Sequence, residues 1–131
     1  MTTLSPASLA RLAGCDSRLH TVFSHVAEAM PCAILEGHRD QEKQDADFAA
    51  GKTQLKWPHG KHNASPSQAV DAAPLPIDWK DRERLSLFAG YVLGVAAGQG
   101  LKLRWGGDWN RDFKVADNHF DDLVHFEIEA G

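Results

Sequence analysis

Two pairs of histidine and aspartate residues have the types and spacing to act together in chemistry. Asp71 follows His62 by nine positions, and Asp122 precedes His125 by three. Two histidines and one carboxylate are a common ligand set of catalytic zinc sites, where three protein ligands leave a fourth position for water. The remaining carboxylate could then accept a proton from that water. The chain has seven histidines, an above-average number that is a first hint of metal or acid–base chemistry.

From their spacing alone, these four residues are more simply explained as a chance grouping than as a metal site. In a chain with seven histidines, His and Asp residues often resemble a ligand set by chance. The spacing also differs from HExxH, in which two ligands share one face of a helix. A zinc site therefore needs support from the surrounding sequence.

Four segments supply that support, because they carry short motifs in a fixed order along the chain. They are Glu36-Gly37-His38-Arg39 with Gln44, Lys61-His62 with Ser67-Gln68-Ala69-Val70-Asp71, Gly106-Gly107-Asp108-Trp109, and Asp122-Leu123-Val124-His125-Phe126-Glu127. The set resembles the GxR…Q, SxHxxGxAxD, WGGDW and DxxHFE motifs of the zinc peptidase family that contains D-Ala-D-Ala carboxypeptidases and L-alanyl-D-glutamate endopeptidases. The resemblance covers about residues 17–128, and the chain is most like the phage endolysins of this family.

The resemblance implies a role for each matching residue. His62, Asp71 and His125 would be the ligands of a Zn²⁺ ion, and Asp122 would be the general base that activates water. Arg39 would be the cation that meets the carboxylate of the substrate or the developing oxyanion. From the residues alone, Arg39 could equally form a surface salt bridge with a neighbouring carboxylate.

The first histidine and the aspartate are farther apart than in the family pattern, where seven positions usually separate them. The nine positions here imply a loop two residues longer, which can leave both ligands in place. His59 is the nearby alternative to His62 as a ligand. His38 and His119 could line the cleft or lie in solvated loops, and Asp121 and His119 are the alternative bases.

Other side chains are weaker candidates for roles around the site. Glu127 could hold the imidazole of a zinc ligand or simply face water. Three tryptophans could form the wall of a substrate groove: Trp57, Trp105 and Trp109. Trp105 is equally expected in the core.

Hydrophobic periodicity and capping residues predict four helices and four strands. The expected helices cover 6–14, 17–30 and 41–49, and a longest helix capped by Asp78 ends at Gly98 to Gly100. The expected strands cover 32–35, 69–73, 101–105 and 123–128. Residues 52–67 form a long loop, and loops of that length are usually functional.

Helices come mostly first and strands mostly late, which favours an α+β fold. The resemblance implies helices packed on a small, mostly antiparallel sheet that carries the zinc site. Pro74 and Pro76 are consistent with a sheet edge or a strand exit. Because an odd spacing places residues on opposite faces of a strand, Asp122 is expected in the turn before the strand that carries His125.

Length, composition and charge exclude several classes of protein. A chain of 131 residues and 14.4 kDa is expected to form one domain, over 1–131, and its 43% apolar and 24% charged residues are typical of globular proteins. The net charge of −4, without a basic run, gives no footprint for nucleic acid. No segment predicts a membrane span or a signal peptide. Cys15 and Cys32 are expected to be reduced and buried, as in a protein made in the cytosol.

The resemblance implies a zinc-dependent peptidase that acts on the peptide stem of peptidoglycan. The bond most expected to be cut joins L-Ala to D-Glu, in an enzyme that works as a phage endolysin during host lysis. We expect a monomer that is held in the host cytoplasm until its release to the cell wall. The alternatives are a D-Ala-D-Ala carboxypeptidase and a non-catalytic, zinc-stabilised module that binds the wall. The spare carboxylate of Asp122 argues against the second alternative, because a structural zinc site needs no base.

Overall fold

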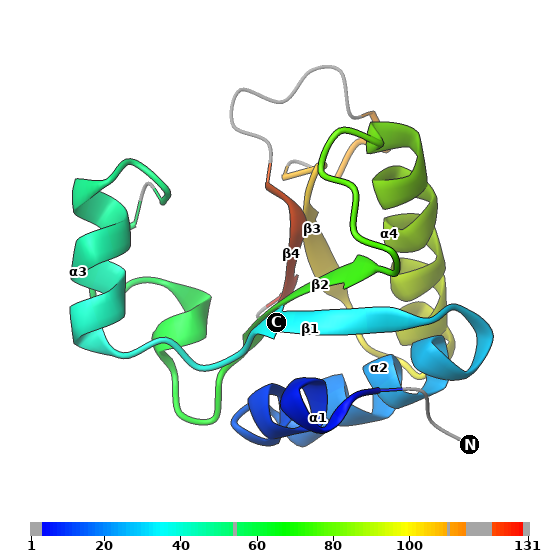
Figure 1. The fold of residues 1–131 in the computed structure, drawn as a ribbon, viewed down its shortest axis with the longest axis horizontal. Helices are drawn as coiled ribbons and strands as arrows, with labels where there is room; N and C mark the ends of the chain where they lie inside the picture. The colour runs from blue at the N-terminus through cyan, green and yellow to red at the C-terminus, as the bar shows by residue number, and fades with distance from the viewer. Residues whose placement is uncertain (1–3, 54, 110, 115–121, 130–131) are drawn as a thin grey trace.

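A computed structural model describes residues 4–53, 55–109, 111–114 and 122–129. Within these residues the chain forms four α-helices, one short 3-10 helix and four strands (Figure 1). In chain order they are α1 (Pro6–Ala13), α2 (Ser17–Ala29), β1 (Cys32–Glu36), α3 (Gln41–Ala49), η1 (Lys61–Asn63), β2 (Ala69–Pro74), α4 (Arg82–Gly98), β3 (Leu103–Gly106) and β4 (Asp122–Ile128). The predicted α+β class is confirmed.

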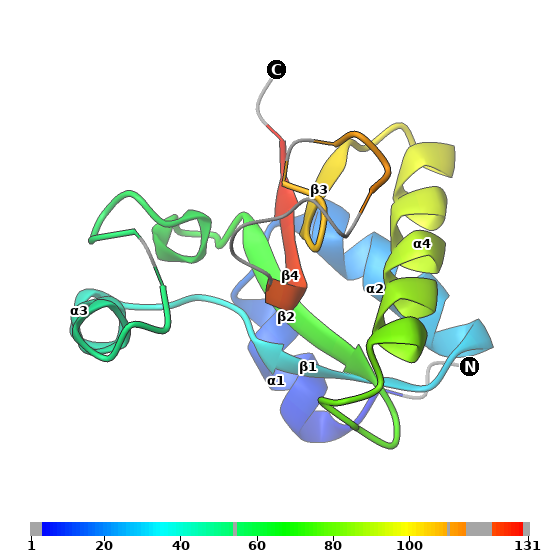
Figure 2. The same cartoon turned by 90° about the horizontal axis from the view of Figure 1, so that it is seen from above.

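The strands form one antiparallel sheet in the order β1-β2-β4-β3. α2 and α4 lie together on one side of this sheet, and α1 lies along β1 (Figure 2). Ser8 of α1 accepts a hydrogen bond from the backbone N–H of Ile34, at 3.0 Å. The helix therefore covers the β1 edge, which would otherwise present unpaired backbone groups.

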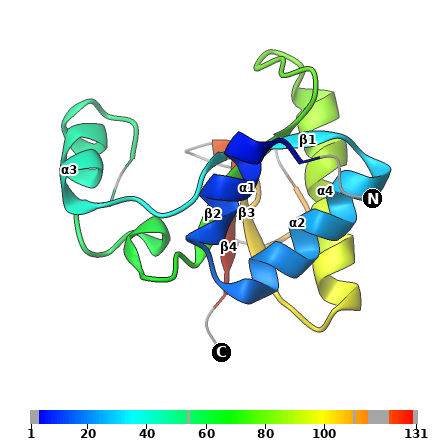
Figure 3. The same cartoon turned by 60° about the horizontal axis from the view of Figure 1, so that its bottom comes forward.

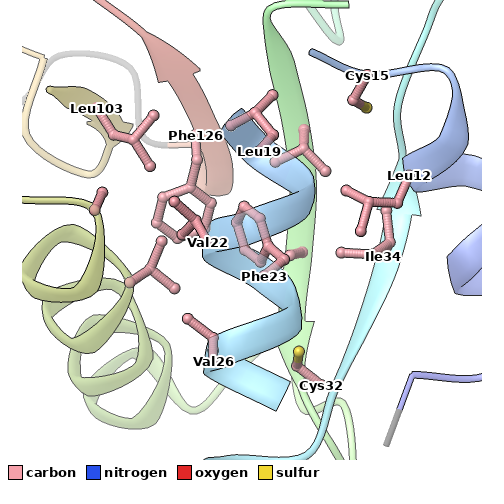
Figure 4. Close-up of a cluster of buried hydrophobic side chains, with 14 of the residues drawn as sticks. Leu12, Cys15, Leu19, Val22, Phe23, Val26, Cys32, Ile34, Leu103 and Phe126 are labelled. Carbon is pink, nitrogen blue, oxygen red and sulfur yellow. The ribbon is translucent and has the colours of Figure 1, made fainter. Parts of the chain in front are cut away.

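The main core lies between the sheet and helices α2 and α4. Phe23 of α2 and Phe88 of α4 both pack edge-to-face against Phe126 of β4, with ring centroids 5.8 and 6.1 Å apart. Figure 4 shows Val22 and Phe23 of α2 beside Phe126. These side chains anchor β4, the strand that also carries the last of the predicted ligands.

Strand alternation separates this core from the opposite face of the sheet. Val70 of β2 is the partner of Phe126 in β4, and both side chains are buried in the core. The next pair along the same ladder is Asp71 with His125. Because successive side chains point to opposite faces, this polar pair lies on the other face of the sheet.

α3 stands apart from the other helices, as Figures 1 and 3 show. Gln44 of this helix is fully buried and connects it to neighbouring segments. Its amide nitrogen donates to the backbone carbonyl of Leu55, and its Oε1 accepts from Arg39 Nη1 and Asn63 Nδ2, each at 3.1 Å. This polar cluster ties α3 and the loop after it to η1, where His62 lies.

The predicted starts of α4 and β3 are wrong. α4 begins at Arg82 with Asp81 as its N-cap, whereas Asp78 was expected to cap it. Asp78 instead accepts a hydrogen bond from the N–H of Lys80 in the preceding turn. The last strand before the glycine turn begins at Leu103 rather than at 101, because the N–H of Leu101 bonds to Ala96 at the end of α4.

Pro74 and Pro76, at and just after the end of β2, mark a strand exit and not a sheet edge. β2 lies between β1 and β4, and Pro74 is its last residue.

Cys15 and Cys32 are buried and free, as predicted. None of the helices in the described residues combines the length and apolar character needed to cross a membrane.

Candidate active site

The three predicted ligands meet at one point on the polar face of the sheet. His62 Nε2 lies 3.1 Å from Asp71 Oδ1 and 3.2 Å from His125 Nδ1, and the last two atoms are 3.2 Å apart. The three atoms thus form a nearly equilateral triangle, contributed by η1, β2 and β4. The longer loop before Asp71 leaves His62 in place.

The triangle fits a tetrahedral zinc ion. Zinc bonds to nitrogen and oxygen of about 2.0–2.1 Å place neighbouring tetrahedral ligands about 3.3–3.4 Å apart. The observed separations of 3.1–3.2 Å are close to this value. Two imidazoles and one carboxylate also match the donor set of a catalytic site with one open position. The residues present therefore suit zinc in both chemistry and spacing.

Each histidine is oriented by the nitrogen that faces away from the triangle. His62 Nδ1 donates to the backbone carbonyl of Gly37 at 2.7 Å, and His125 Nε2 donates to Glu127 Oε1 at 2.9 Å. Both acceptors lack a proton to give, so the proton on each of these bonds belongs to the imidazole. The remaining nitrogens, His62 Nε2 and His125 Nδ1, are thereby directed at the shared point, as in established metal sites.

Gly37 allows the end of β1 to approach α1 closely enough to place its carbonyl beside His62. A Cβ atom on Gly37 would lie 2.3 Å from the backbone oxygen of Arg11 and 2.9 Å from Cys15 Sγ. Such contacts are sterically forbidden, so this position requires glycine. The GxR motif therefore has a packing reason that the sequence did not reveal.

Asp122 is the first residue of β4, whereas we expected it in the turn before that strand. The pairing register shifts between Trp105 and Gly106, so that Gly106 is opposite Asp122. A Cβ on Gly106 would lie 2.1 Å from the Asp122 backbone oxygen, so this close approach requires glycine. The irregular register breaks the alternation that would otherwise separate Asp122 from His125.

The surroundings of Asp122 favour its protonated form. Burial raises the pKa of this carboxyl, and the negative charge of Asp71 raises it further. The charges of His125, His62 and Arg39 act in the opposite direction but do not reverse the shift. Asp122 is therefore close enough to the triangle to be influenced by it electrostatically, and it binds a proton more readily than an exposed aspartate.

Hydrogen bonds around the triangle favour the protonated form of His125 and the ionised form of Asp71. Burial lowers the pKa of His125, but hydrogen bonds to Asp71 and Glu127 outweigh it and raise the pKa to about 9. For Asp71, burial raises the pKa, whereas hydrogen bonds with His125 and His62 lower it well below the usual range. The triangle thus contains a carboxylate that remains ionised and attracts positive charge.

Arg39 lies in a cluster of acidic and amide groups. Its Nε donates to Glu36 Oε1 at 2.8 Å, and it also forms an ion pair with Asp47 at 3.4 Å. Its side chain is 11% exposed, and its backbone N–H donates to the carbonyl of His62 at 2.8 Å. The structure therefore places Arg39 beside the ligand segment, with its guanidinium paired to carboxylates of the protein.

The alternative histidines do not join the ligand group found in the described residues. His59 and His38 are both exposed, and neither belongs to the cluster of His62 with its two partners. His119 and Asp121 lie outside the residues that the structure describes.

The tryptophans divide between the core and the site. Trp105 is 5% exposed and packs in the core, where its Nε1 donates to the carbonyl of Leu123 at 2.8 Å. The ring of Trp109 lies 5.4 Å from that of His125, between centroids, so it borders the site. Trp57 is half-buried in the loop before η1.

Sequence reasoning missed one charged residue on this face. Arg104 of β3 donates from Nη2 to Glu127 Oε2 at 2.8 Å. The alternation of 101–105 could have indicated it, since Arg104 falls on the opposite side from Leu103 and Trp105.

Comparisons with known proteins identify a family and a shared fold. A family model described as phage L-alanyl-D-glutamate peptidase matches residues 1–128. The crystal structure of the L-Ala D-Glu endopeptidase ChiX from Serratia marcescens is similar, with a TM-score of 0.76 and 23% sequence identity over 96% of this chain and 90% of that chain. This likeness shows a shared fold. A search of curated proteins found no match. Because the family model covers nearly the whole chain, the protein belongs to the phage L-alanyl-D-glutamate peptidase family.

Proposed function

We propose that this peptidoglycan hydrolase depends on zinc, with His62, Asp71 and His125 as the ligands. The observation that carries the proposal is the triangle of ligand atoms 3.1–3.2 Å apart. The hydrogen bonds of the two outer ring nitrogens support it further, because they orient both imidazoles for metal binding.

Zinc would supply a Lewis acid for the scissile carbonyl and would lower the pKa of an attacking water toward neutrality. We assign the role of general base to Asp122. Its carboxylate accepts a proton from water as the carbon–oxygen bond forms, and then gives that proton to the leaving amine as the carbon–nitrogen bond breaks. The raised pKa of Asp122, caused by burial and by Asp71, supports a group that both accepts and returns a proton.

We assign Arg39 to the substrate's carboxylate or to the developing oxyanion. The positive charge of Arg39 is felt at Asp122, where it lowers the pKa, and its backbone is bonded to His62. A guanidinium presents several N–H donors in a plane, so it can keep one protein carboxylate while it binds another group. In this role, a substrate carboxylate competes with Glu36 and Asp47 for the donors of Arg39.

Digestion of purified peptidoglycan, followed by mass analysis of the new termini, tests the proposal. We expect new amino termini at D-Glu, loss of activity in a chelator, and recovery on addition of zinc. Release of D-Ala would instead identify a carboxypeptidase. Zinc binding without any new termini would identify a wall-binding module, and full activity in chelator would exclude zinc dependence.

We further propose that the protein acts as a monomeric phage endolysin, held in the host cytoplasm and released to the cell wall at lysis. Its membership of a phage peptidase family supports this role. Expression in a bacterial host, with and without a pore-forming protein, tests the release step. Lysis is expected only when both are present, and lysis by the peptidase alone would contradict the expectation.

A further inference from the structure

Arg104, Glu127 and His125 form a continuous chain of hydrogen bonds that ends at the ligand triangle. Arg104 Nη2 donates to Glu127 Oε2 at 2.8 Å, and His125 Nε2 donates to Glu127 Oε1 at 2.9 Å. The other nitrogen of the same imidazole, Nδ1, is the ligand atom. Each oxygen of the Glu127 carboxylate therefore has its own partner, and one of these partners is the proposed metal ligand His125.

The sheet fixes this arrangement. Arg104 in β3 and Glu127 in β4 are direct cross-strand partners, so their side chains share one face. His125 is two positions from Glu127 on the same strand and so lies on that face as well. The three residues thus rest on paired backbone rather than on a loop.

Trp109 covers the same chain of residues. The Arg104 guanidinium lies over the Trp109 ring, 5.4 Å from its centroid, and the His125 ring is also 5.4 Å from that ring. A flat guanidinium can stack on an aromatic face while it donates in its own plane. Arg104 is therefore restrained both by Glu127 and by Trp109.

One buried nitrogen of Arg104 lowers the stability of the folded protein. Its Nε is buried and has no hydrogen-bond partner among the residues that the structure describes, although the side chain as a whole is 38% exposed. A buried donor without a partner costs free energy of folding. Glu127, whose side chain is 5% exposed, would in turn lose the partner of one oxygen if Arg104 were absent.

We propose that Arg104 is a positioning residue for the metal site, which acts through Glu127 on His125. Arg104 holds the Glu127 carboxylate in the place where it accepts the Nε2 proton of His125, and this directs Nδ1 at the metal. The inference rests on the proposed function, because it requires His125 to be a metal ligand.

When Arg104 is replaced, the loss of its charge and the loss of its positioning role predict opposite changes in zinc affinity. This difference makes the proposal testable. By Coulomb's law alone, removal of a nearby positive charge favours binding of Zn²⁺. Loss of positioning disfavours it, and groups that orient metal ligands typically contribute about 10–100-fold to metal affinity. The direction of the change in zinc affinity therefore separates the two effects.

The experiment compares Arg104→Met with the matched control Arg111→Met. Arg111 forms an ion pair with Glu129, just after β4, and in the described structure it has no hydrogen bond or ion pair with the three proposed ligands. Zinc dissociation constants are measured by competition with a chromogenic chelator, and the melting temperature of each metal-free protein checks folding. We expect zinc affinity to fall about 10–100-fold in Arg104→Met and to stay within about twofold in Arg111→Met.

Two further variants test the route through Glu127. Arg104→Lys keeps the charge but has no planar fork to join Glu127 and Trp109, so we expect weaker zinc binding, whereas charge alone predicts no change. In the double variant Arg104→Met with Glu127→Gln, we expect affinity no lower than in Glu127→Gln alone, since residues that act in series are not additive.

Several outcomes would overturn the inference. Unchanged or tighter zinc binding in both Arg104 variants would exclude positioning, and additive effects in the double variant would exclude a route through Glu127. A raised KM with unchanged zinc affinity would show that Arg104 contacts substrate instead. If the parent protein binds no zinc at all, the proposed function fails too, which distinguishes that result from failure of Arg104 alone.

Discussion

Asp71 and His125 are direct partners in the β2–β4 ladder, with Asp71 Oδ1 and His125 Nδ1 3.2 Å apart. Two of the three proposed ligand atoms are thus positioned by one pair of hydrogen-bonded strands. The third, from His62, comes from the short helix η1 and is held by the carbonyl of Gly37. The sheet therefore supplies two of the proposed ligands, and the carbonyl of Gly37, directly after β1, orients the third.

Asp122→Asn should separate catalysis from metal binding. Asparagine keeps the size of the side chain but cannot accept a proton from water, so zinc content and folding should stay close to those of the parent. Loss of a general base typically lowers the rate about 10²–10⁴-fold. Release of amino termini from peptidoglycan measures the activity, and elemental analysis measures the zinc.

His125→Ala is the contrasting variant, because it removes a ligand. Metal content and activity should fall together in this protein. Parent-level activity in Asp122→Asn would show that another group is the base, and Asp121 and His119 would be the next residues to test.

Zinc affinity should depend on pH through His125. In the metal-free protein the pKa of His125 is raised to about 9, so at pH 7 the imidazole is protonated and must lose that proton to bind metal. Apparent affinity should therefore rise about tenfold per pH unit toward pH 9 and level off above it. Chelator competition over pH 7–10, corrected for protonation of the chelator, measures this slope.

The stability of the metal-free protein should change in the opposite direction over the same range. A pKa raised from 6.5 to about 9 on folding contributes stability that is complete below about pH 6.5 and is lost as the pH rises through 9. Melting temperatures without metal should therefore fall from pH 7 to 10. In Glu127→Gln, which lacks the anionic acceptor, both pH dependences should move to lower pH; unchanged profiles would contradict the role of this hydrogen bond.

Gly37→Ala should destabilise the protein. The added Cβ would lie 2.3 Å from the backbone oxygen of Arg11, so β1 and α1 must move apart. Overpacking of this kind costs about 1–3 kcal/mol, and displacement of the Gly37 carbonyl should also weaken zinc binding through His62. Denaturant unfolding of the metal-free protein measures the first effect and chelator competition the second.

Gly94→Ala is the matched control for this substitution. Gly94 lies within α4 and a Cβ there would meet nothing within 4 Å, so alanine should stabilise the helix by about 0.5–1 kcal/mol. Equal effects of the two substitutions would rule out the close approach at Gly37 as the cause.

Cys15 and Cys32 should react slowly with thiol reagents in the folded protein. Burial raises the pKa of each thiol to about 11, so few thiolates are present at pH 8 and access is restricted. Both should react quickly after unfolding in denaturant, and the mass of the non-reduced protein should equal that of the dithiol form. A mass lower by two hydrogen atoms would show a disulfide and contradict the structure.

Local sequence was enough to predict the helices wherever the signal for their start was a single residue. Ser5, Asp16 and Asp40 cap the helices that were expected to begin at 6, 17 and 41. The predicted start of α4 was wrong because Asp78 and Asp81 are both suitable N-cap residues. Tertiary contacts decided between them: Arg84 donates to the carbonyls of Leu75 and Pro76, which holds the preceding segment as a loop.

The candidate ligands were also predicted from the sequence, because motif order survives a loop that is longer by two residues. By itself the sequence determined which residue types were available: two imidazoles, a ligand carboxylate and a spare carboxylate. Only the tertiary structure decided which atoms meet. The choice of Nε2 in His62 and Nδ1 in His125 depends on the acceptors Gly37 and Glu127, one of them 25 residues from its partner. Strand register likewise brought Arg104 to Glu127, 23 residues away. Hydrogen bonds between distant segments are set by packing, and no local pattern of residues specifies them.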